Sequence, residues 1–166
     1  MNRATPLVIA ALAACIASAA VLAADPVRLT GRVVTVTDGD TLTILDSDRV
    51  QHRIRLDGID APEKAQAFGN RSRQSLAELA HDREAVATCP KVDRYGRHVC
   101  KVMVGGADVG LEQIRRGLAW HFKRYEDEQR PKDRRAYAKT EDEARAARRG
   151  LWRDPDPVAP WDWRAR

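Results

Sequence analysis

The first half of the chain consists of short segments in which β-branched and other apolar residues alternate with polar ones. Three of them follow one another at residues 27–36 (VRLTGRVVTV), 41–45 (TLTIL) and 50–56 (VQHRIRL), with Asp-Gly and Asp-Ser-Asp turn signals between them. This spacing is typical of a β-meander. Two more strands are predicted at residues 84–89 (EAVATC) and 98–104 (HVCKVMV), on either side of the loop PKVDRYGR.

A helical pattern interrupts these strands at residues 70–82 (NRSRQSLAELAHD). Leu76, Leu79 and Ala80 fall on one face of this helix, and Asn70 is its expected N-cap. The period of the strands resumes after it, so we expect this helix to be inserted between two strands.

The C-terminal part changes to a helical period. A short helix is predicted, ending at Gly117, from four apolar residues: Val109, Leu111, Ile114 and Leu118. A longer helix is predicted over residues 131–149, since Pro131 in its first turn and Gly150 after its end fit the usual asymmetry. Its packed side is expected to hold five residues: Tyr137, Thr140, Ala144, Ala147 and Leu151. We interpret its many charged residues as a solvated face rather than a nucleic-acid-binding stripe.

Five strands with one inserted and two trailing helices predict an α+β domain, a small antiparallel five-stranded β-barrel of the OB type with three helices. A sandwich of the same strands is the alternative that the pattern leaves open. We place this domain at residues 25–153. The remaining tail, residues 154–166, is rich in Pro but contains Trp161 and Trp163, and we expect both rings to dock on the domain.

The N-terminus has the pattern of an export signal. Asn2 and Arg3 precede an uncharged run, residues 7–24, that is dominated by Ala, Leu, Ile and Val. We therefore predict that residues 1–24 are a signal peptide and that the mature protein is secreted or periplasmic. A stable membrane span is not expected, because the run is short and rich in Ala. Cys15 follows Leu-Ala-Ala as in a lipoprotein processing site, so lipid anchoring through Cys15 is the alternative.

The mature chain is expected to carry a small positive net charge. Removing residues 1–24 takes away Arg3 and no acid, so Lys and Arg fall from 29 to 28 against 24 Asp and Glu. This small positive surplus suits a polyanionic partner.

Cys89 and Cys100 remain in the chain after removal of the signal peptide, and an oxidising compartment predicts a disulfide between them. The chain has no Cys-x-x-Cys pair and its four His have no ligand spacing, which argues against structural zinc.

Charged residues are dense in a segment that is otherwise half apolar, RIRLDGIDAPE at residues 53–63. Three acids stand out there and in DGDT: Asp40, Asp60 and Glu63. Each has a simpler structural explanation, as a hairpin turn, a loop opening or a helix cap. Together, Asp40 and Asp60 at one end of a barrel would repel each other unless a hard cation lay between them. Two carboxylates, the Ala61 carbonyl and water would make an open calcium or magnesium site. The spacing of the acids excludes an EF-hand.

Two arginines complete this set. Arg55 lies five residues before Asp60 on the same predicted strand, and Arg97 ends the loop segment DRYGR. A guanidinium stays charged and fits phosphate oxygens with two parallel hydrogen bonds. Alone, Arg55 is explained as an ion-pair partner of Asp60 and DRYGR as a hairpin loop. A cation, two arginines and the spare Glu63 together are suited to phosphodiester hydrolysis.

Five motifs in this order, DGDT, RIRLDGIDAPE, DRYGR, RRGLAW and RRGLW, resemble the thermonuclease (staphylococcal-nuclease-like) family over about residues 28–153. The resemblance implies an OB-fold barrel with three helices and a calcium-dependent nuclease that cuts DNA and RNA with little sequence preference, leaving 3'-phosphates. It implies Ca²⁺ ligands at Asp40, Asp60 and the Ala61 carbonyl, and catalytic roles for three residues: Arg55, Glu63 and Arg97.

The resemblance also implies a substrate-binding set: Arg94, Tyr95, Lys123 and Tyr125. Tyr95 matches a ring at the phosphate end of the bound nucleotide, and Tyr125 one of two aromatics of the nucleotide pocket. Lys123 stands where the family has the second Tyr, and Arg94 where it has a Lys. Both keep positive charge, so phosphate affinity should persist. We expect a monomer without a small-molecule cofactor. A non-catalytic nucleic-acid-binding OB module and a metal-dependent phosphatase are the alternatives.

Overall fold

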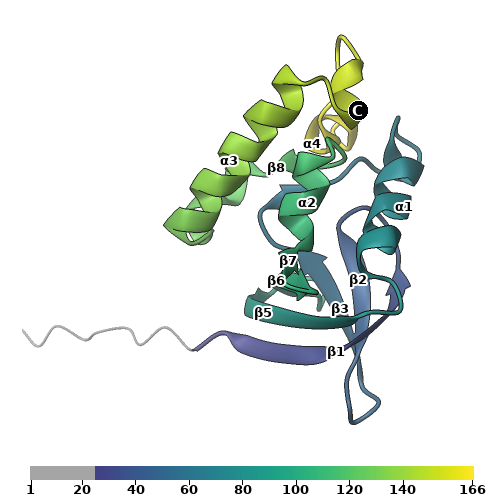
Figure 1. The fold of residues 1–166 in the computed structure, drawn as a ribbon, viewed down its shortest axis with the longest axis vertical. Helices are drawn as coiled ribbons and strands as arrows, with labels where there is room; N and C mark the ends of the chain where they lie inside the picture. The colour runs from purple at the N-terminus through teal and green to yellow at the C-terminus, as the bar shows by residue number, and fades with distance from the viewer. Residues whose placement is uncertain (1–24) are drawn as a thin grey trace, which may run out of the picture.

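The computed structural model describes residues 25–166, and its strands close into a barrel with the helices packed on one side of it (Figure 1). The predicted signal peptide, residues 1–24 with Cys15, lies outside the described residues. Among residues 25–166, no helix has the length and apolar character needed to cross a membrane.

Eight strands and six helices make up the described part of the chain. The strands are β1 (Val27–Val36), β2 (Thr41–Leu45), β3 (Gln51–Leu56), β4 (Ile59–Asp60), β5 (Glu84–Val92), β6 (His98–Val104), β7 (Ala107–Asp108) and β8 (Trp120–His121). The α-helices are α1 (Gly69–Ala80), α2 (Val109–Arg115), α3 (Pro131–Ala146) and α4 (Pro160–Trp163), and the 3-10 helices are η1 (Lys123–Glu128) and η2 (Gly150–Arg153).

The barrel is closed by a pair of parallel strands. The sheet runs β3-β2-β1-β5-β6-β7, and β3 also pairs with β6, from Ile54 opposite His98 to Leu56 opposite Cys100. The five predicted strands, the α+β class and the three predicted helices are confirmed. The expectation that every pair is antiparallel is wrong at β3 and β6, and this closure excludes the sandwich.

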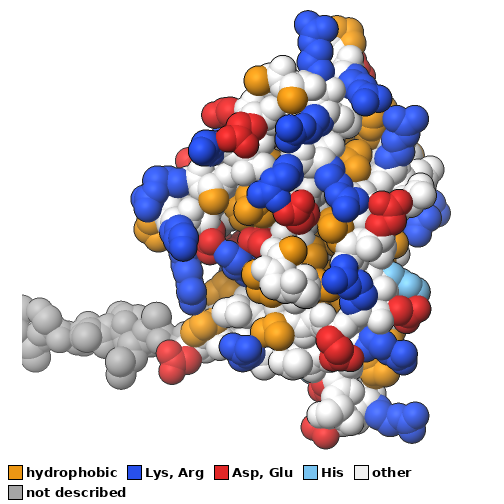
Figure 2. Space-filling model, viewed as in Figure 1, with side chains coloured by type: hydrophobic (Ala, Val, Ile, Leu, Met, Phe, Trp, Pro, Cys, Tyr) orange, Lys and Arg blue, Asp and Glu red, His pale blue; other side chains and the backbone are white. Residues whose placement is uncertain are grey.

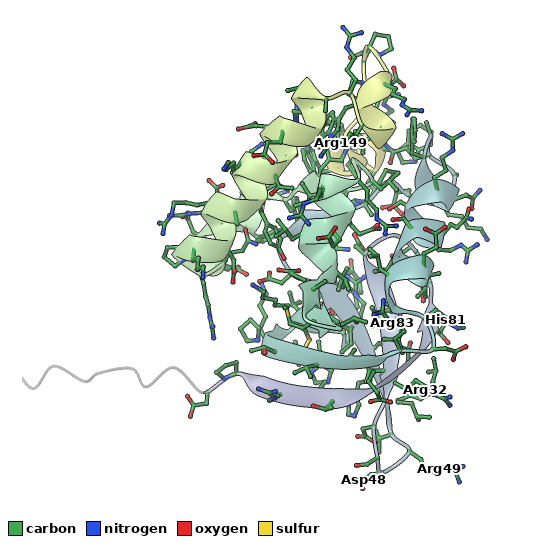
Figure 3. All side chains as sticks on the ribbon, in the orientation of Figure 1. Arg32, Asp48, Arg49, His81, Arg83 and Arg149 are labelled. Carbon is green, nitrogen blue, oxygen red and sulfur yellow. A yellow bond between two sulfur atoms is a disulfide. The ribbon has the colours of Figure 1, made fainter. Side chains whose placement is uncertain are left out.

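The barrel interior is the main core. It is filled by side chains without solvent exposure, among them Val33, Leu42, Ile44, Ile54, Leu76 and Ala87. Leu76 comes from α1, and the others lie on strands whose inward-facing residues fall at every second position, so one face of each strand points inward. The turn between β2 and β3 points away from the helices, as its labelled residues Asp48 and Arg49 show in Figure 3.

A second, aromatic cluster joins the C-terminal part to the barrel. It consists of Trp120, Ala144, Leu151, Trp152 and Ala159, with Phe68 and Trp161 packed against it. Trp163 is half-buried and lines a small pocket. The prediction that both tail tryptophans dock on the domain is therefore confirmed.

The helix ends differ from the predictions in two places, at the start of α1 and at the end of α3. Phe68, not Asn70, is the N-cap residue of α1, and Asn70 is exposed inside the helix. The cap of α2 is Asp108, whose side chain accepts hydrogen bonds from two backbone N–H groups of the first turn. α3 ends at Ala146, and Ala147 is an exposed C-cap residue rather than part of the packed side. Gly117 follows the end of α2 with φ 67°, as predicted.

The charged face of α3 is solvated and mixed in sign. Arg134 pairs with Asp127, and Lys139 with Glu143. On the face shown in Figure 2, Lys and Arg side chains alternate with Asp and Glu and do not gather in one stripe. This arrangement agrees with the interpretation of α3 as a solvent-facing helix.

Candidate active site

The turn that joins β1 to β2 places Asp40 against Ala61. Gly39 is pressed against α1, since a Cβ atom on it would lie 1.9 Å from Ser72 Oγ and 2.7 Å from Ala61 Cβ. Gly39 O also accepts a hydrogen bond from Gln113 Nε2 at 2.8 Å. Asp40 follows, buried, and its Oδ2 accepts a hydrogen bond from Ala61 N at 3.0 Å. Only glycine fits this turn, and the turn fixes the position of Asp40.

Asp60 reaches the same end of the barrel from a separate strand. It lies on β4, opposite Trp120 of β8, and is fully buried. The expectation that Asp60 shares a strand with Arg55 is wrong, because the chain turns at Asp57 and Gly58 between β3 and β4. Gly58 has φ 70°, the left-handed region that favours glycine.

Arg55 links the two buried acids. Its Nη1 lies 2.6 Å from Asp40 Oδ1, and its Nη2 donates to Asp60 Oδ1 at 2.9 Å. Nη2 also lies 3.3 Å from Ile59 O, to which it donates. Arg55 thus has the ion-pair partner that the simpler explanation requires, and it has Asp40 as a second. The structure brings Asp40, Asp60 and Arg55 together as the sequence predicted.

Glu63 lies on the segment between β4 and α1. Its backbone N donates to Gln66 Oε1 at 3.1 Å, and its carbonyl accepts from Gln66 N at 2.8 Å. The interpretation of Glu63 as a helix cap is wrong, because α1 begins only at Gly69 and has no side-chain cap. The Glu63 carboxylate is half-buried and lines the cleft described below.

Arg97 is fixed by an acid that the sequence analysis missed. Asp93 Oδ2 accepts from Arg97 Nε and also lies near Nη2, both at 2.8 Å. Asp93 Oδ1 accepts from the backbone N of Tyr95 and of Arg97. Burial would raise the pKa of Asp93, but these hydrogen bonds hold it below its ordinary value. Asp93 therefore closes the loop and aims the guanidinium of Arg97, whose Nη1 lies 3.5 Å from Thr41 Oγ1.

A disulfide holds the strands that carry this loop. Cys89 on β5 and Cys100 on β6 are joined, with Cα atoms 4.1 Å apart. Both residues are buried. The predicted disulfide is confirmed, and it closes the ring that contains Asp93 and Arg97.

An open cleft runs along this end of the barrel. Its lining includes Asp40, Arg55, Glu63 and Arg97, together with Arg94, Tyr95 and Tyr125 from the predicted substrate-binding set. Tyr95 is 63% exposed, and the Arg94 guanidinium lies over its ring, 4.8 Å from the centroid. Tyr125 is 44% exposed, with Lys91 Nζ 5.3 Å from its ring centroid.

Lys123 is the one predicted substrate-binding residue that does not line this cleft. Its Nζ donates to Glu141 Oε2 at 2.5 Å, and Glu141 is fully buried in α3. The structure thus places Lys123 beside α3, where its charge is paired.

The C-terminal tail contributes a residue that the sequence analysis did not connect with the site. Arg164, directly after α4, donates from Nη2 to Asp60 Oδ2 at 2.7 Å and from Nη1 to Glu63 Oε1 at 2.6 Å. Nη1 also lies 3.3 Å from Asp60 Oδ1. The sequence predicted that Trp161 and Trp163 dock on the domain, but no local motif indicated that Arg164 contacts the acids of the site.

Burial and charge act against each other on the acids of the site. Burial disfavours the charged form of Asp40, but Arg55 and a backbone N–H hold its pKa below the ordinary value. Burial raises the pKa of Asp60 in spite of hydrogen bonds from Arg164. Burial and the charge of Asp40 raise the pKa of Asp38 to about 6. Asp40 is thus held ionised by Arg55, whereas the ionised forms of Asp60 and Asp38 would be favoured by further positive charge, which a divalent cation would supply.

Comparisons with known proteins find a matching family and several similar sequences. The family model of staphylococcal nuclease homologues matches residues 53–154. A micrococcal nuclease of Shigella flexneri is 41% identical over 143 residues, which cover 81% of this chain and 79% of the relative. An uncharacterized endonuclease of Escherichia coli O157:H7 is 41% identical over 147 residues, 88% of this chain and 90% of the relative. Protein ParB of Escherichia coli is 39% identical over 93% of this chain and 91% of its own length.

Proposed function

The chain belongs to the family of staphylococcal nuclease homologues and is a nuclease, and from this membership we propose a more specific activity. It hydrolyses the phosphodiester bonds of DNA and RNA with little sequence specificity, in a calcium-dependent reaction that leaves 3'-phosphates. The observation that carries the proposal is the pair of buried carboxylates, Asp40 and Asp60, beside a cleft lined by Arg55, Glu63 and Arg97.

The donor set proposed for calcium consists of oxygen atoms alone. No group of three or more His, Cys, Asp and Glu side chains in residues 25–166 is arranged to hold a metal. Two carboxylates, from Asp40 and Asp60, and the carbonyl of Ala61 fit a hard cation that takes its remaining ligands from water and substrate. When bound, the cation would neutralise charge on the phosphate.

The chain's own residues have three roles in the proposed reaction. Glu63 orients an attacking water, or takes its proton, opposite the scissile 5'-oxygen, so the phosphate stays on the 3' side. Arg55 and Arg97 donate hydrogen bonds to the phosphoryl oxygens as negative charge develops on them. Arg97 is preorganised for this role, because Asp93 holds its Nε and Nη2 while Nη1 is left toward Thr41 and the cleft.

The substrate-binding part of the proposal rests on exposed groups along the cleft. The rings of Tyr95 and Tyr125 can stack on bases, which every base permits and which gives little sequence preference. Arg94 adds positive charge for the phosphate backbone. Lys123 stays outside this set, because its charge is paired with Glu141 beside α3. The protein acts as a monomer, after export and removal of residues 1–24.

Digestion of plasmid DNA and of RNA by residues 25–166 tests the proposal. We expect cutting with calcium, poor cutting with magnesium and none with a chelator. Magnesium demands a tighter octahedron and loses water reluctantly, so an open site with few rigid ligands suits it less well. Labelling of product ends should detect phosphate on the 3' side.

Glu63→Gln is the matched control for this experiment, because it keeps the size of the side chain and removes the charge. It should be inactive under all three conditions while retaining the circular dichroism spectrum of the wild type. Undiminished cutting by the wild type in chelator would contradict the calcium-centred mechanism. Phosphate on the 5' side of the products would contradict the proposed geometry of attack.

A further inference from the structure

The C-terminal tail is held against the barrel at several points before it reaches the site. Val158 O accepts a hydrogen bond from Gln66 Nε2 at 2.6 Å, and Pro160 is buried at the start of α4. The Trp161 ring stacks on Phe122 with 5.4 Å between centroids and an interplanar angle of 11°. Trp161 also packs edge-on against Trp120. The position of the residues that follow Trp161 is therefore determined by packing.

Arg164 meets both kinds of acid in the site. One carboxylate, Asp60, belongs to the proposed cation ligands, and the other, Glu63, to the proposed water-positioning group. The guanidinium spans them, with Nη2 on Asp60 Oδ2 at 2.7 Å and Nη1 on Glu63 Oε1 at 2.6 Å. Asp60 is fully buried, so an unpaired charge on it would be costly, and Arg164 supplies the second positive partner beside Arg55.

A divalent cation would need the same oxygens. Calcium binds carboxylate oxygen at about 2.3 to 2.6 Å, which is close to the distance at which Arg164 Nη2 now lies from Asp60 Oδ2. Arg55 already lies on Asp60 Oδ1, so the cation would have to bind at Oδ2, the oxygen that Arg164 contacts. A guanidinium and a divalent cation cannot share this one oxygen at such distances without strong repulsion. One of them has to leave Asp60 when the other binds.

Of the cations at the site, Arg164 is the one that is able to leave. Arg55 is only 17% exposed and is held by Asp40, Asp60 and the Ile59 carbonyl. Arg97 is held by Asp93. The Arg164 side chain, in contrast, is 43% exposed.

We propose that Arg164 sets the cation affinity of the site by occupying Asp60 and Glu63 until a divalent cation displaces it. The inference rests on the proposed function, since it takes Asp60 as a cation ligand. Displacement also frees Glu63 for the attacking water. Arg164 is a positioning residue here, because it acts through the two carboxylates.

Calorimetric titration of calcium into residues 25–166, without nucleic acid, tests this inference. Arg164→Ala should bind calcium about tenfold or more tightly than the wild type, the scale on which one adjacent charge alters the occupancy of a carboxylate by a proton. Arg164→Lys keeps the charge but cannot span two carboxylates, so its affinity should lie between the two. Arg166→Ala is the matched control, since it removes the same charge from the same tail without contact to Asp60, and its affinity should stay near that of the wild type.

The outcomes separate the inference from the function on which it rests. Equal or weaker calcium binding by Arg164→Ala, with clear binding by the wild type, would overturn the inference and leave the proposed function standing. An equal gain in Arg164→Ala and Arg166→Ala would reduce the effect to net charge and would also overturn it. If none of the proteins bound calcium, the proposed calcium site itself would be wrong.

Discussion

Asp93 holds the guanidinium of Arg97 in place, and this contact determines the expected effect of replacing Arg97. Arg97→Ala should lower kcat about 100- to 1000-fold, the usual cost of losing one preorganised donor to developing charge, while KM changes less. Stability should fall by about 1 to 3 kcal/mol, because the largely buried Asp93 loses a charged partner. The fold should persist, since the Asp93 carboxylate still accepts two backbone N–H groups. Steady-state kinetics and the melting temperature check both parts.

The conservative replacement separates charge from geometry at the same position. Arg97→Lys should recover only part of kcat, because an ammonium group cannot form two parallel hydrogen bonds to phosphate. A higher KM with unchanged kcat in Arg97→Ala would contradict the catalytic role and make Arg97 a substrate-binding residue.

Single residues were predictable where their motif is local. Asp40, Asp60 and Arg55 stand close together in the sequence, and the structure brings them together at one end of the barrel. Arg164 lies 104 residues from Asp60 and 101 from Glu63, so no pattern of neighbours announces their contact. Lys123 was placed by resemblance alone, and its partner Glu141 depends on how α3 packs.

At the scale of elements, the hairpin of β5 and β6 is the support of the Arg97 loop. The bridge between Cys89 and Cys100, 11 residues apart, closes a short ring around this loop. Replacing both cysteines by Ser should lower the free energy of unfolding by about 2 to 3 kcal/mol in the loop-entropy model. Denaturant titration of the double variant measures this loss. Unchanged stability would show that the ring does not restrict the unfolded chain.

Strands and helices were predicted more reliably than their ends. Alternating and helical periods identified all five barrel strands and the three main helices. The ends depend on particular contacts: a Cβ on Gly69 would lie 2.0 Å from Glu63 O, so the start of α1 is set by the preceding segment and not by Asn70. Asp108 caps α2 and also accepts from Tyr137 Oη of α3 at 3.0 Å, a contact that appears only when both helices are packed.

For the whole molecule, closure of the barrel was the least predictable step. The parallel pairing of β3 with β6 joins segments that are far apart in sequence. The meander of β1, β2 and β3, in contrast, is predicted by the turn residues between consecutive strands. The pattern therefore left barrel and sandwich open until the resemblance implied the barrel. The same closure brings the Arg97 loop next to Arg55, since Arg55 lies opposite Val99 of β6.

The C-terminal tail connects the aromatic cluster, through Trp161, with Asp60 and Glu63, through Arg164. Replacing Trp161 tests this connection. Trp161→Ala should lower the free energy of unfolding by about 1 to 3 kcal/mol, as a half-buried aromatic ring is lost. It should also raise calcium affinity, because Arg164 is no longer held over Asp60 and Glu63. Asp162→Ala, an exposed change in the same helix, is the control and should alter neither quantity.

The double variant shows whether the two residues act along one route. If Trp161 affects the site only by placing Arg164, then Trp161→Ala combined with Arg164→Ala should bind calcium no more tightly than Arg164→Ala alone. Calorimetry on the four proteins of this cycle measures the coupling. Additive gains in affinity would mean that Trp161 influences Asp60 independently of Arg164, and the tail would then act on the site through the aromatic cluster rather than through a guanidinium.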